Sequence, residues 1–165
     1  MSRAERRGKP SPRPDPRRLD RGLERFRQVL RERSLKMSLV REAIARAALS
    51  YDGHFSVDEL LAVLQASGVR EAHMATIYRA VPLMVEAGLI QQAPAAHSDG
   101  QRYEVAFERD HHDHLVCTGC GRMIEYQSEA LEALQQEIAA RYDFELDTHV
   151  HVLRGRCRDC RRATQ

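Results

Sequence analysis

The chain has 165 residues and a mass of 18.9 kDa; 42% of its residues are hydrophobic and 30% are charged. This length suits one ordinary domain or two small ones. No apolar run approaches the roughly 18 to 20 residues that a membrane-spanning helix needs, and the N-terminal residues lack the apolar stretch of a secretory signal. These features argue against a membrane protein, a secreted disulfide scaffold and a fully disordered chain.

The net charge of +2 is unevenly distributed along the chain. The first twenty residues carry seven basic and three acidic side chains, so the remainder has a net charge of −2. Four of the six prolines also lie in this N-terminal part, where they oppose both helix and sheet. We therefore expect residues 1–18 to form a disordered basic arm. The arm either contacts nucleic-acid phosphates or is a solvated extension without a partner.

Two helical patterns follow the arm. Apolar residues recur at helical spacing over 19–33, which predicts a first helix there. Ser38 is a suitable N-cap for a second helix over 39–49. We expect residues 51–55 to form the loop after it.

Capping signals define the next two helices. Ser56 and Glu59 have the spacing of a capping box, in which each side chain bonds to the backbone of the other residue. They predict a third helix over 57–66, which ends at Gly68. A fourth helix is expected over 73–87.

The fourth helix contains Pro82, which removes one backbone hydrogen bond and should kink the helix axis. Two short strands are expected after it, over 89–92 and 102–105. A series of helices followed by a two-stranded hairpin is the outline of a winged helix, a helix-turn-helix with a β-wing. We therefore predict a winged helix-turn-helix DNA-binding domain over 19–107.

Residues 108–165 have a different pattern and predict a small α+β domain. Three short strands are expected over 114–116, 123–126 and 149–153, with a helix over 129–141 between the second and the third. Three strands bury little apolar surface alone. Such a unit is typical of a dimerisation domain.

The four cysteines form two Cys-x-x-Cys pairs with 36 residues between them. A chain without a secretory signal is expected in a reducing compartment, where disulfides are disfavoured. Two Cys-x-x-Cys turns supply four soft thiolates in a tetrahedron, as in structural zinc sites. The alternatives are a redox dithiol or four unrelated buried cysteines. A closed site of four sulfurs has no open coordination position, so we expect a structural role for Cys117, Cys120, Cys157 and Cys160.

A second group of metal-ligand residue types lies just before the first cysteine pair. In a strand, successive side chains alternate between faces. His112 and His114 would then point one way, and His111 and Asp113 the other, so one tetrapeptide can serve two metal sites. Imidazole and carboxylate ligands suit iron, manganese, zinc or cobalt. Candidate partners elsewhere in the chain are His54, Glu104, Glu125, Glu132 and His149. The alternative for each of them is a solvated surface residue that binds no metal.

These motifs together resemble the ferric uptake regulator (Fur) family of metal-responsive repressors. The resemblance covers about 35–160 and rests on three segments: His111–Glu125, with its histidine cluster and first cysteine pair, Ala75–Arg79 and Leu35–Arg41. It implies a homodimer with an N-terminal winged helix and a C-terminal α+β dimerisation domain.

The resemblance also assigns site residues. The four cysteines match the structural zinc site of the family. A regulatory site at the hinge between the domains is implied for His54, Glu104, His112, His114 and Glu125. A second site within the dimerisation domain is implied for His111, Asp113, Glu132 and His149. Tyr78 and Arg79 match residues of the recognition helix that meets the major groove, and Lys36 matches a minor-groove contact.

The function that this resemblance implies is a cytoplasmic, metal-dependent repressor that binds double-stranded operator DNA when its regulatory site is filled. We expect structural Zn²⁺ and a regulatory Fe²⁺, with Mn²⁺ or Zn²⁺ as alternatives, and neither a membrane nor a small-molecule substrate as partner. Other members of the family sense zinc, manganese or peroxide. A metalloenzyme is disfavoured, because the chain has no His-Glu-x-x-His, no Gly-x-Ser-x-Gly and no phosphate-binding loop. A zinc-ribbon adaptor that binds only protein is the third alternative.

Overall fold

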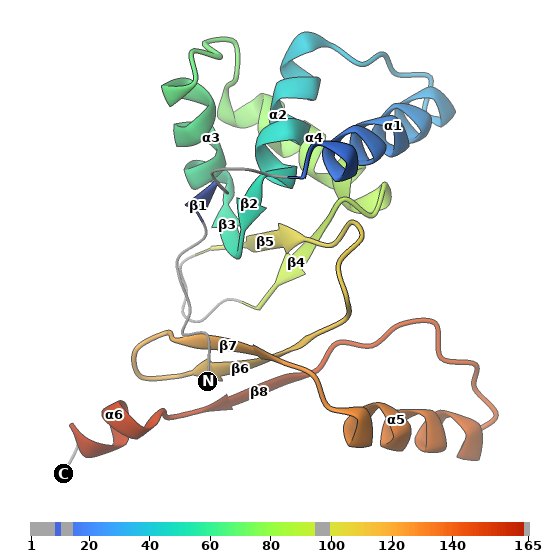
Figure 1. Cartoon of the computed structure of the whole chain (residues 1–165), viewed down its shortest axis with the longest axis vertical. Helices are drawn as coiled ribbons and strands as arrows, with labels where there is room; N and C mark the ends of the chain where they lie inside the picture. The colour runs from blue at the N-terminus through green and yellow to red at the C-terminus, as the bar shows by residue number, and fades with distance from the viewer. Residues whose placement is uncertain (1–8, 11–14, 95–99, 164–165) are drawn as a thin grey trace. The chain divides into compact units, whose positions relative to one another are not determined.

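The computed structural model describes residues 9–10, 15–94 and 100–163 (Figure 1). The chain divides after Arg109 into two compact units, here called the N-terminal and the C-terminal unit. Both contain helices and a three-stranded sheet. Within the described part of the chain, no helix is long and apolar enough to cross a membrane.

The first helix, α1 (Pro16–Glu32), begins three residues earlier than its apolar pattern indicated. The Asp15 side chain accepts a hydrogen bond from the Arg17 backbone N–H at 3.0 Å and so caps the helix. Proline is favourable in the first turn, because its fixed φ suits a helix and its missing N–H would have no helical partner there. The expected arm is therefore wrong over residues 16–18, which belong to the helix.

Lys9–Pro10 form a short strand, β1, which pairs with β2 (Tyr51–Asp52). This also departs from the expected arm, and the sheet accepts a proline here because β1 is an edge strand. The remainder of the expected arm, apart from Asp15, lies outside the described residues.

The next helices follow the predictions closely. Helix α2 (Leu39–Leu49) is capped by Ser38, and the capping box of Ser56 and Glu59 begins α3 (Val57–Ala66). Gly68, just after α3, has a φ of +82°, a conformation that favours glycine. Helix α4 (Met74–Glu86) continues through Pro82 as one helix.

The wing has one strand more than predicted. Strand β5 (Arg102–Val105) lies between β4 (Ile90–Ala93) and β3 (His54–Ser56), so the sheet order is β3-β5-β4. The expected loop over 51–55 is therefore wrong. Strands of two and three residues are too short to show an alternating pattern, and β3 is defined by its pairing with β5, almost fifty residues later.

The core of the N-terminal unit forms between the helices and the inner face of this sheet. Phe26 of α1, Ile44 of α2, Leu60 of α3 and Met84 of α4 are each fully buried, as is Phe55 of β3. Because β3 carries a core residue, the position of the neighbouring His54 is fixed by packing as well as by strand pairing.

The C-terminal unit has a sheet of order β7-β6-β8, made by β6 (Asp113–Cys117), β7 (Met123–Tyr126) and β8 (Val152–Gly155). Strands β6 and β8 are parallel, so the chain must cross over between them. Helix α5 (Glu129–Arg141) lies within this connection, and α6 (Arg158–Arg162) follows β8. The helices lie at opposite ends of the sheet (Figure 1).

Two sequence predictions fail in this unit. The third strand was expected over 149–153 but begins at Val152, so His149 precedes it. Its register is set by parallel pairing with β6 rather than by local alternation. Helix α6 was not predicted, because a five-residue helix with no buried residue leaves no apolar period in the sequence.

Candidate metal centres and DNA-reading helix

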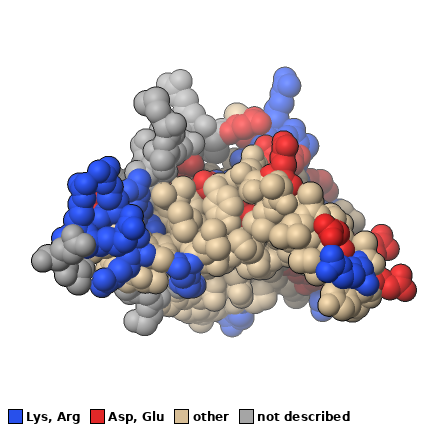
Figure 2. Space-filling model, turned by 90° about the horizontal axis from the view of Figure 1, so that it is seen from below, with Lys and Arg blue, Asp and Glu red and all other residues tan. Residues whose placement is uncertain are grey.

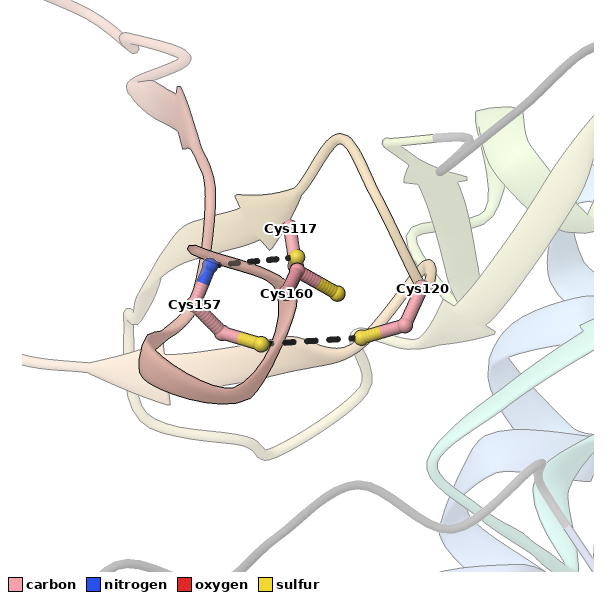
Figure 3. A group of neighbouring side chains, drawn as sticks. All are labelled: Cys117, Cys120, Cys157 and Cys160. Carbon is pink, nitrogen blue, oxygen red and sulfur yellow. Dashed lines mark hydrogen bonds between the residues drawn. The ribbon is translucent and has the colours of Figure 1, made fainter. Parts of the chain in front are cut away.

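The four cysteines converge at one end of the C-terminal sheet (Figure 3). Cys117 ends β6, Cys120 lies in the turn that follows, Cys157 caps α6 and Cys160 lies within it. Their sulfur atoms all lie within 4.8 Å of one another. The Cys120 and Cys157 sulfurs are 3.8 Å apart, which is about the separation of ligands in a zinc–sulfur tetrahedron with bonds of about 2.3 Å. The geometry therefore fits a closed zinc site.

Backbone N–H groups stabilise the thiolate form of Cys117. Its sulfur accepts hydrogen bonds from the N–H groups of Cys157 at 3.2 Å and Gly119 at 3.4 Å. The bond from Cys157 is the main cause that lowers the pKa of Cys117 to about 5. Hydrogen bonds with the Cys120 and Cys157 thiols raise the pKa of Cys160 to about 12. Zinc binding would release thiol protons, because the metal is held by thiolates.

Gly119 allows the two cysteine turns to approach. A Cβ atom at this position would lie 2.8 Å from the Cys160 sulfur and 2.9 Å from its Cβ. We expect Gly119→Ala to weaken zinc retention in a competition with a chelator, since either the turn or the Cys160 ligand must move. Gly155→Ala is the matched control, because nothing lies within 4 Å of a Cβ there. Equal zinc retention in both variants would contradict this close-approach role.

A second cluster lies wholly within the C-terminal unit and contains His111, Asp113, Glu132 and His149. The Nε2 atoms of both histidines lie 3.3 Å from Glu132 Oε1, and they lie 3.4 and 3.7 Å from Asp113 Oδ1. The two imidazole rings meet edge to face, 4.3 Å apart. Strand β6, helix α5 and the segment before β8 each supply ligand types to this cluster.

The buried atoms of this cluster fit a cation. Both carboxylate oxygens of Asp113 and the Nε2 of His149 are buried, and none has a hydrogen-bond partner among the described residues. Such atoms are costly to bury without a hydrogen bond. Two imidazoles and two carboxylates would instead suit a borderline divalent metal.

The opposite face of the same segment carries His112 and His114, as expected for an extended chain. Their rings lie 5.1 Å apart. His114 pairs in register with Glu125 of β7, and His112 Nε2 lies 4.0 Å from Glu125 Oε1. The C-terminal unit thus brings together three of the five residues of the implied regulatory site.

The other two residues of that implied site meet in the N-terminal unit. His54 of β3 is the register partner of Glu104 of β5, and His54 Nε2 lies 3.1 Å from Glu104 Oε2. Glu104 also accepts a hydrogen bond from Gln91 at 2.9 Å and lies 3.7 Å from Arg109. Sequence reasoning missed Gln91 and Arg109: Gln91 meets Glu104 through the register of β4 with β5, and Arg109 lies in the turn that follows β5.

The expected DNA-contacting residues are exposed on the N-terminal unit. Tyr78 is 56% exposed and Arg79 is exposed beside it, whereas Ile77 and Ala80 of the same helix, α4, are buried. Lys36 is exposed in the segment between α1 and α2, where its carbonyl accepts a hydrogen bond from Arg41 at 2.6 Å. One face of α4 is therefore fixed by the core and the other presents Tyr78 and Arg79.

Comparisons with known proteins agree on one family. The model of the ferric uptake regulator family matches residues 32–153. A ferric uptake regulation protein of Campylobacter upsaliensis is 33% identical over 144 residues, which cover 87% of this chain and 91% of the relative.

Solved structures give the same result. The Helicobacter pylori ferric uptake regulator, described as having three functional metal binding sites, has a TM-score of 0.74 at 26% identity and covers 87% of this chain and 93% of its own. The Vibrio cholerae ferric uptake regulator, described with a structural rearrangement of its DNA-binding domains, has a TM-score of 0.61 at 34% identity. It covers 79% of this chain and 98% of its own. The α+β fold matches these structures, and the C-terminal part of this chain contains the cluster of four cysteines. The chain belongs to the ferric uptake regulator family of metal-responsive regulators.

Proposed function

We propose that this chain is an iron-responsive transcriptional repressor that binds double-stranded operator DNA as a homodimer when its regulatory metal site is filled. The observation that carries the proposal is the division of the implied ligands between the units. His54 and Glu104 are paired in the unit that presents Tyr78 and Arg79. His112, His114 and Glu125 are grouped in the other unit.

A metal held by residues of both units would couple metal binding to DNA binding. A ligand shifts a conformational equilibrium only by its difference in affinity for the two states. A site contained in one unit changes little when the units rotate, whereas a site shared by both is made or lost. In a dimer, the angle between the units sets the spacing of two recognition helices, which must match successive major grooves. The rearranged DNA-binding domains of the Vibrio cholerae relative support such a rotation.

The proposed metals follow from the ligand types. Zn²⁺ at the four cysteines is structural, because the set is closed and has no open position. For the regulatory site we propose Fe²⁺, supported by its imidazole and carboxylate ligands and by the ferric uptake regulation proteins among the relatives. All four cysteines of the chain belong to the zinc cluster, so a regulatory site has no thiolate to favour zinc.

An exposed apolar surface supports the homodimer. A groove of about 630 Å³ runs along α5 and the segment after it, between Leu131 and His151. Among the large apolar side chains of this region, Tyr142 is 70% exposed and Phe144 is 73% exposed. Contiguous apolar surface of this kind marks an interface, and we propose that it is covered by the same surface of a second copy.

Replacing Arg79 tests the proposed reading of DNA. If Arg79 contacts a base edge, Arg79→Ala should weaken operator binding by roughly 1 to 3 kcal/mol, with metal content unchanged. Arg46→Ala is a control on an exposed arginine of α2 that is already paired with Glu42. Fluorescence anisotropy on an operator selected from a random duplex pool measures both. Unchanged operator binding by Arg79→Ala would mean that the recognition helix has been misplaced.

A metal series tests the proposed function as a whole. The zinc-loaded dimer is titrated into the selected operator without added metal and with Fe²⁺, Mn²⁺ or Zn²⁺ under anoxic conditions. We expect tight binding only with added metal, and Fe²⁺ should produce it at a free concentration that cells maintain. Operator binding that needs no added metal would contradict metal-dependent repression, and the absence of any DNA binding would favour the protein-binding adaptor. Because operator DNA lies in the bacterial cytoplasm, we propose that the protein acts there.

A further inference from the structure

The C-terminal unit carries a second concentration of positive charge, far from α4 in the sequence. Five arginines occur within the nine residues 154–162, with Asp159 as the single acidic residue among them. All five are exposed. Figure 2 shows basic side chains gathered on the side of the molecule where α6 lies. We call this group, Arg154, Arg156, Arg158, Arg161 and Arg162, the arginine cluster.

The cysteine site holds the arginine cluster in a fixed backbone. Cys157 and Cys160 alternate with the arginines and turn toward the other two cysteines. The Thr118 N–H donates to the Gly155 carbonyl at 2.8 Å, and the Arg161 N–H donates to the Cys157 carbonyl at 3.0 Å. Arg158, Arg161 and Arg162 have the i, i+3, i+4 spacing that places side chains on one face of a helical turn. The side chains are therefore presented together.

The charge of the cluster exceeds what the zinc site needs. Four thiolates around Zn²⁺ carry a formal charge of −2, and Asp159 adds one more negative charge. Five arginines outweigh this by two positive charges. Among the described residues, no acidic side chain forms an ion pair with Arg156, Arg158, Arg161 or Arg162. Neutralisation of the thiolates therefore does not account for the whole cluster.

We propose that the arginine cluster is a second DNA-binding surface, which contacts phosphates of duplex DNA without reading sequence. Arginine donates a planar fork of N–H groups that matches phosphate oxygens, and the cluster contains arginine but no lysine. Duplex DNA is favoured over an acidic protein segment because this family of regulators already works on DNA. The surface is independent of Tyr78 and Arg79, and it does not depend on the regulatory metal.

Salt dependence gives a direct test. The full-length, zinc-loaded chain is titrated with a duplex that lacks the operator, without added regulatory metal, from 50 to 200 mM salt. Log K falls as log salt rises, and each lost phosphate contact reduces the magnitude of this negative slope by about 0.9. The triple variant Arg158→Gln, Arg161→Gln, Arg162→Gln should therefore reduce the slope by about 2 to 3 per bound subunit and weaken binding at 50 mM by more than about tenfold.

Matched variants separate charge from folding. The corresponding triple lysine variant keeps the charge and should retain the slope, and both triples should hold one zinc per subunit. If the triple glutamine variant loses zinc, the double variant Arg161→Gln, Arg162→Gln replaces it, with an expected slope change of about 1 to 2. Arg46→Ala, at an exposed arginine of α2 that is paired with Glu42, should leave this non-operator binding unchanged. Because the titration uses neither operator nor regulatory metal, failure here is distinct from failure of the repressor function.

Two results would overturn the proposal. One is non-operator binding by the zinc-containing glutamine variants that equals that of the wild type at every salt concentration. The other is polyglutamate binding that the glutamine variants lose while their DNA binding stays intact, which would assign the cluster to an acidic protein segment.

Discussion

Replacing Cys117 with serine is expected to release about one zinc ion per subunit and to lower the free energy of unfolding by several kcal/mol, because structural zinc binding is coupled to folding. Cys117 has the largest expected effect. It lies at the end of the central strand β6, and its sulfur accepts hydrogen bonds from the backbone N–H groups of both Cys157 and Gly119.

The C-terminal unit depends on this site because its own core is small. Among its described hydrophobic residues, only Val116, Cys117, Met123 and Ala139 are buried. The cysteine site joins the turn after β6 to the residues after β8. Loss of zinc should therefore loosen the sheet and, with it, the proposed dimer.

Zinc analysis combined with denaturant unfolding measures this effect. Cys157→Ser should behave like Cys117→Ser, whereas Thr118→Ala, an exposed position in the same turn, should change neither zinc content nor stability appreciably. A Cys117→Ser protein that is fully dimeric, as stable as the wild type and as rich in zinc would contradict the structural role of the site.

The second large effect is expected at the proposed regulatory site. His54→Ala or His112→Ala should abolish the metal dependence of operator binding while leaving a folded dimer that contains structural zinc. Each variant removes an imidazole from one unit's share of the ligands, so metal can no longer favour one arrangement of the units.

The second cluster provides the contrast. Asp113→Ala and Glu132→Ala remove ligand types that lie in the C-terminal unit alone. These variants should lower stability or metal content and have a smaller effect on regulation. Asp113→Ala also removes a buried carboxylate. The oxygens of this carboxylate have no hydrogen-bond partner among the described residues.

The elements that could be predicted are those with local signals. The Ser38 cap and the capping box of Ser56 and Glu59 define the starts of α2 and α3 to the residue. The start of α1 was missed because Pro16 was treated as a helix breaker, although the first turn tolerates proline. Strand β3 was missed because its partner β5 is distant in the sequence. Local signals therefore predicted α2 and α3 and the bounds of β5 and β7, whereas long-range pairing decided β3 and β8.

The same distinction applies to the candidate sites. Alternation along an extended chain was sufficient to separate His111 and Asp113 from His112 and His114. The pairing of His54 with Glu104 was implied only by family resemblance, since it arises from the register of β3 with β5. The contacts of Gln91 and Arg109 with Glu104 had no sequence signal, because they depend on the register of β4 with β5 and on the turn after β5.

A metal titration of operator binding by His54→Ala, His112→Ala, Asp113→Ala and Glu132→Ala tests the central claim most directly. Fluorescence anisotropy at fixed protein concentration reports the free metal concentration at which each variant binds DNA. The shared-site account predicts no response to metal in the two histidine variants and a retained response in the two carboxylate variants. A response that Asp113→Ala eliminates and His112→Ala preserves would contradict it, because the regulatory metal would then lie in the second cluster.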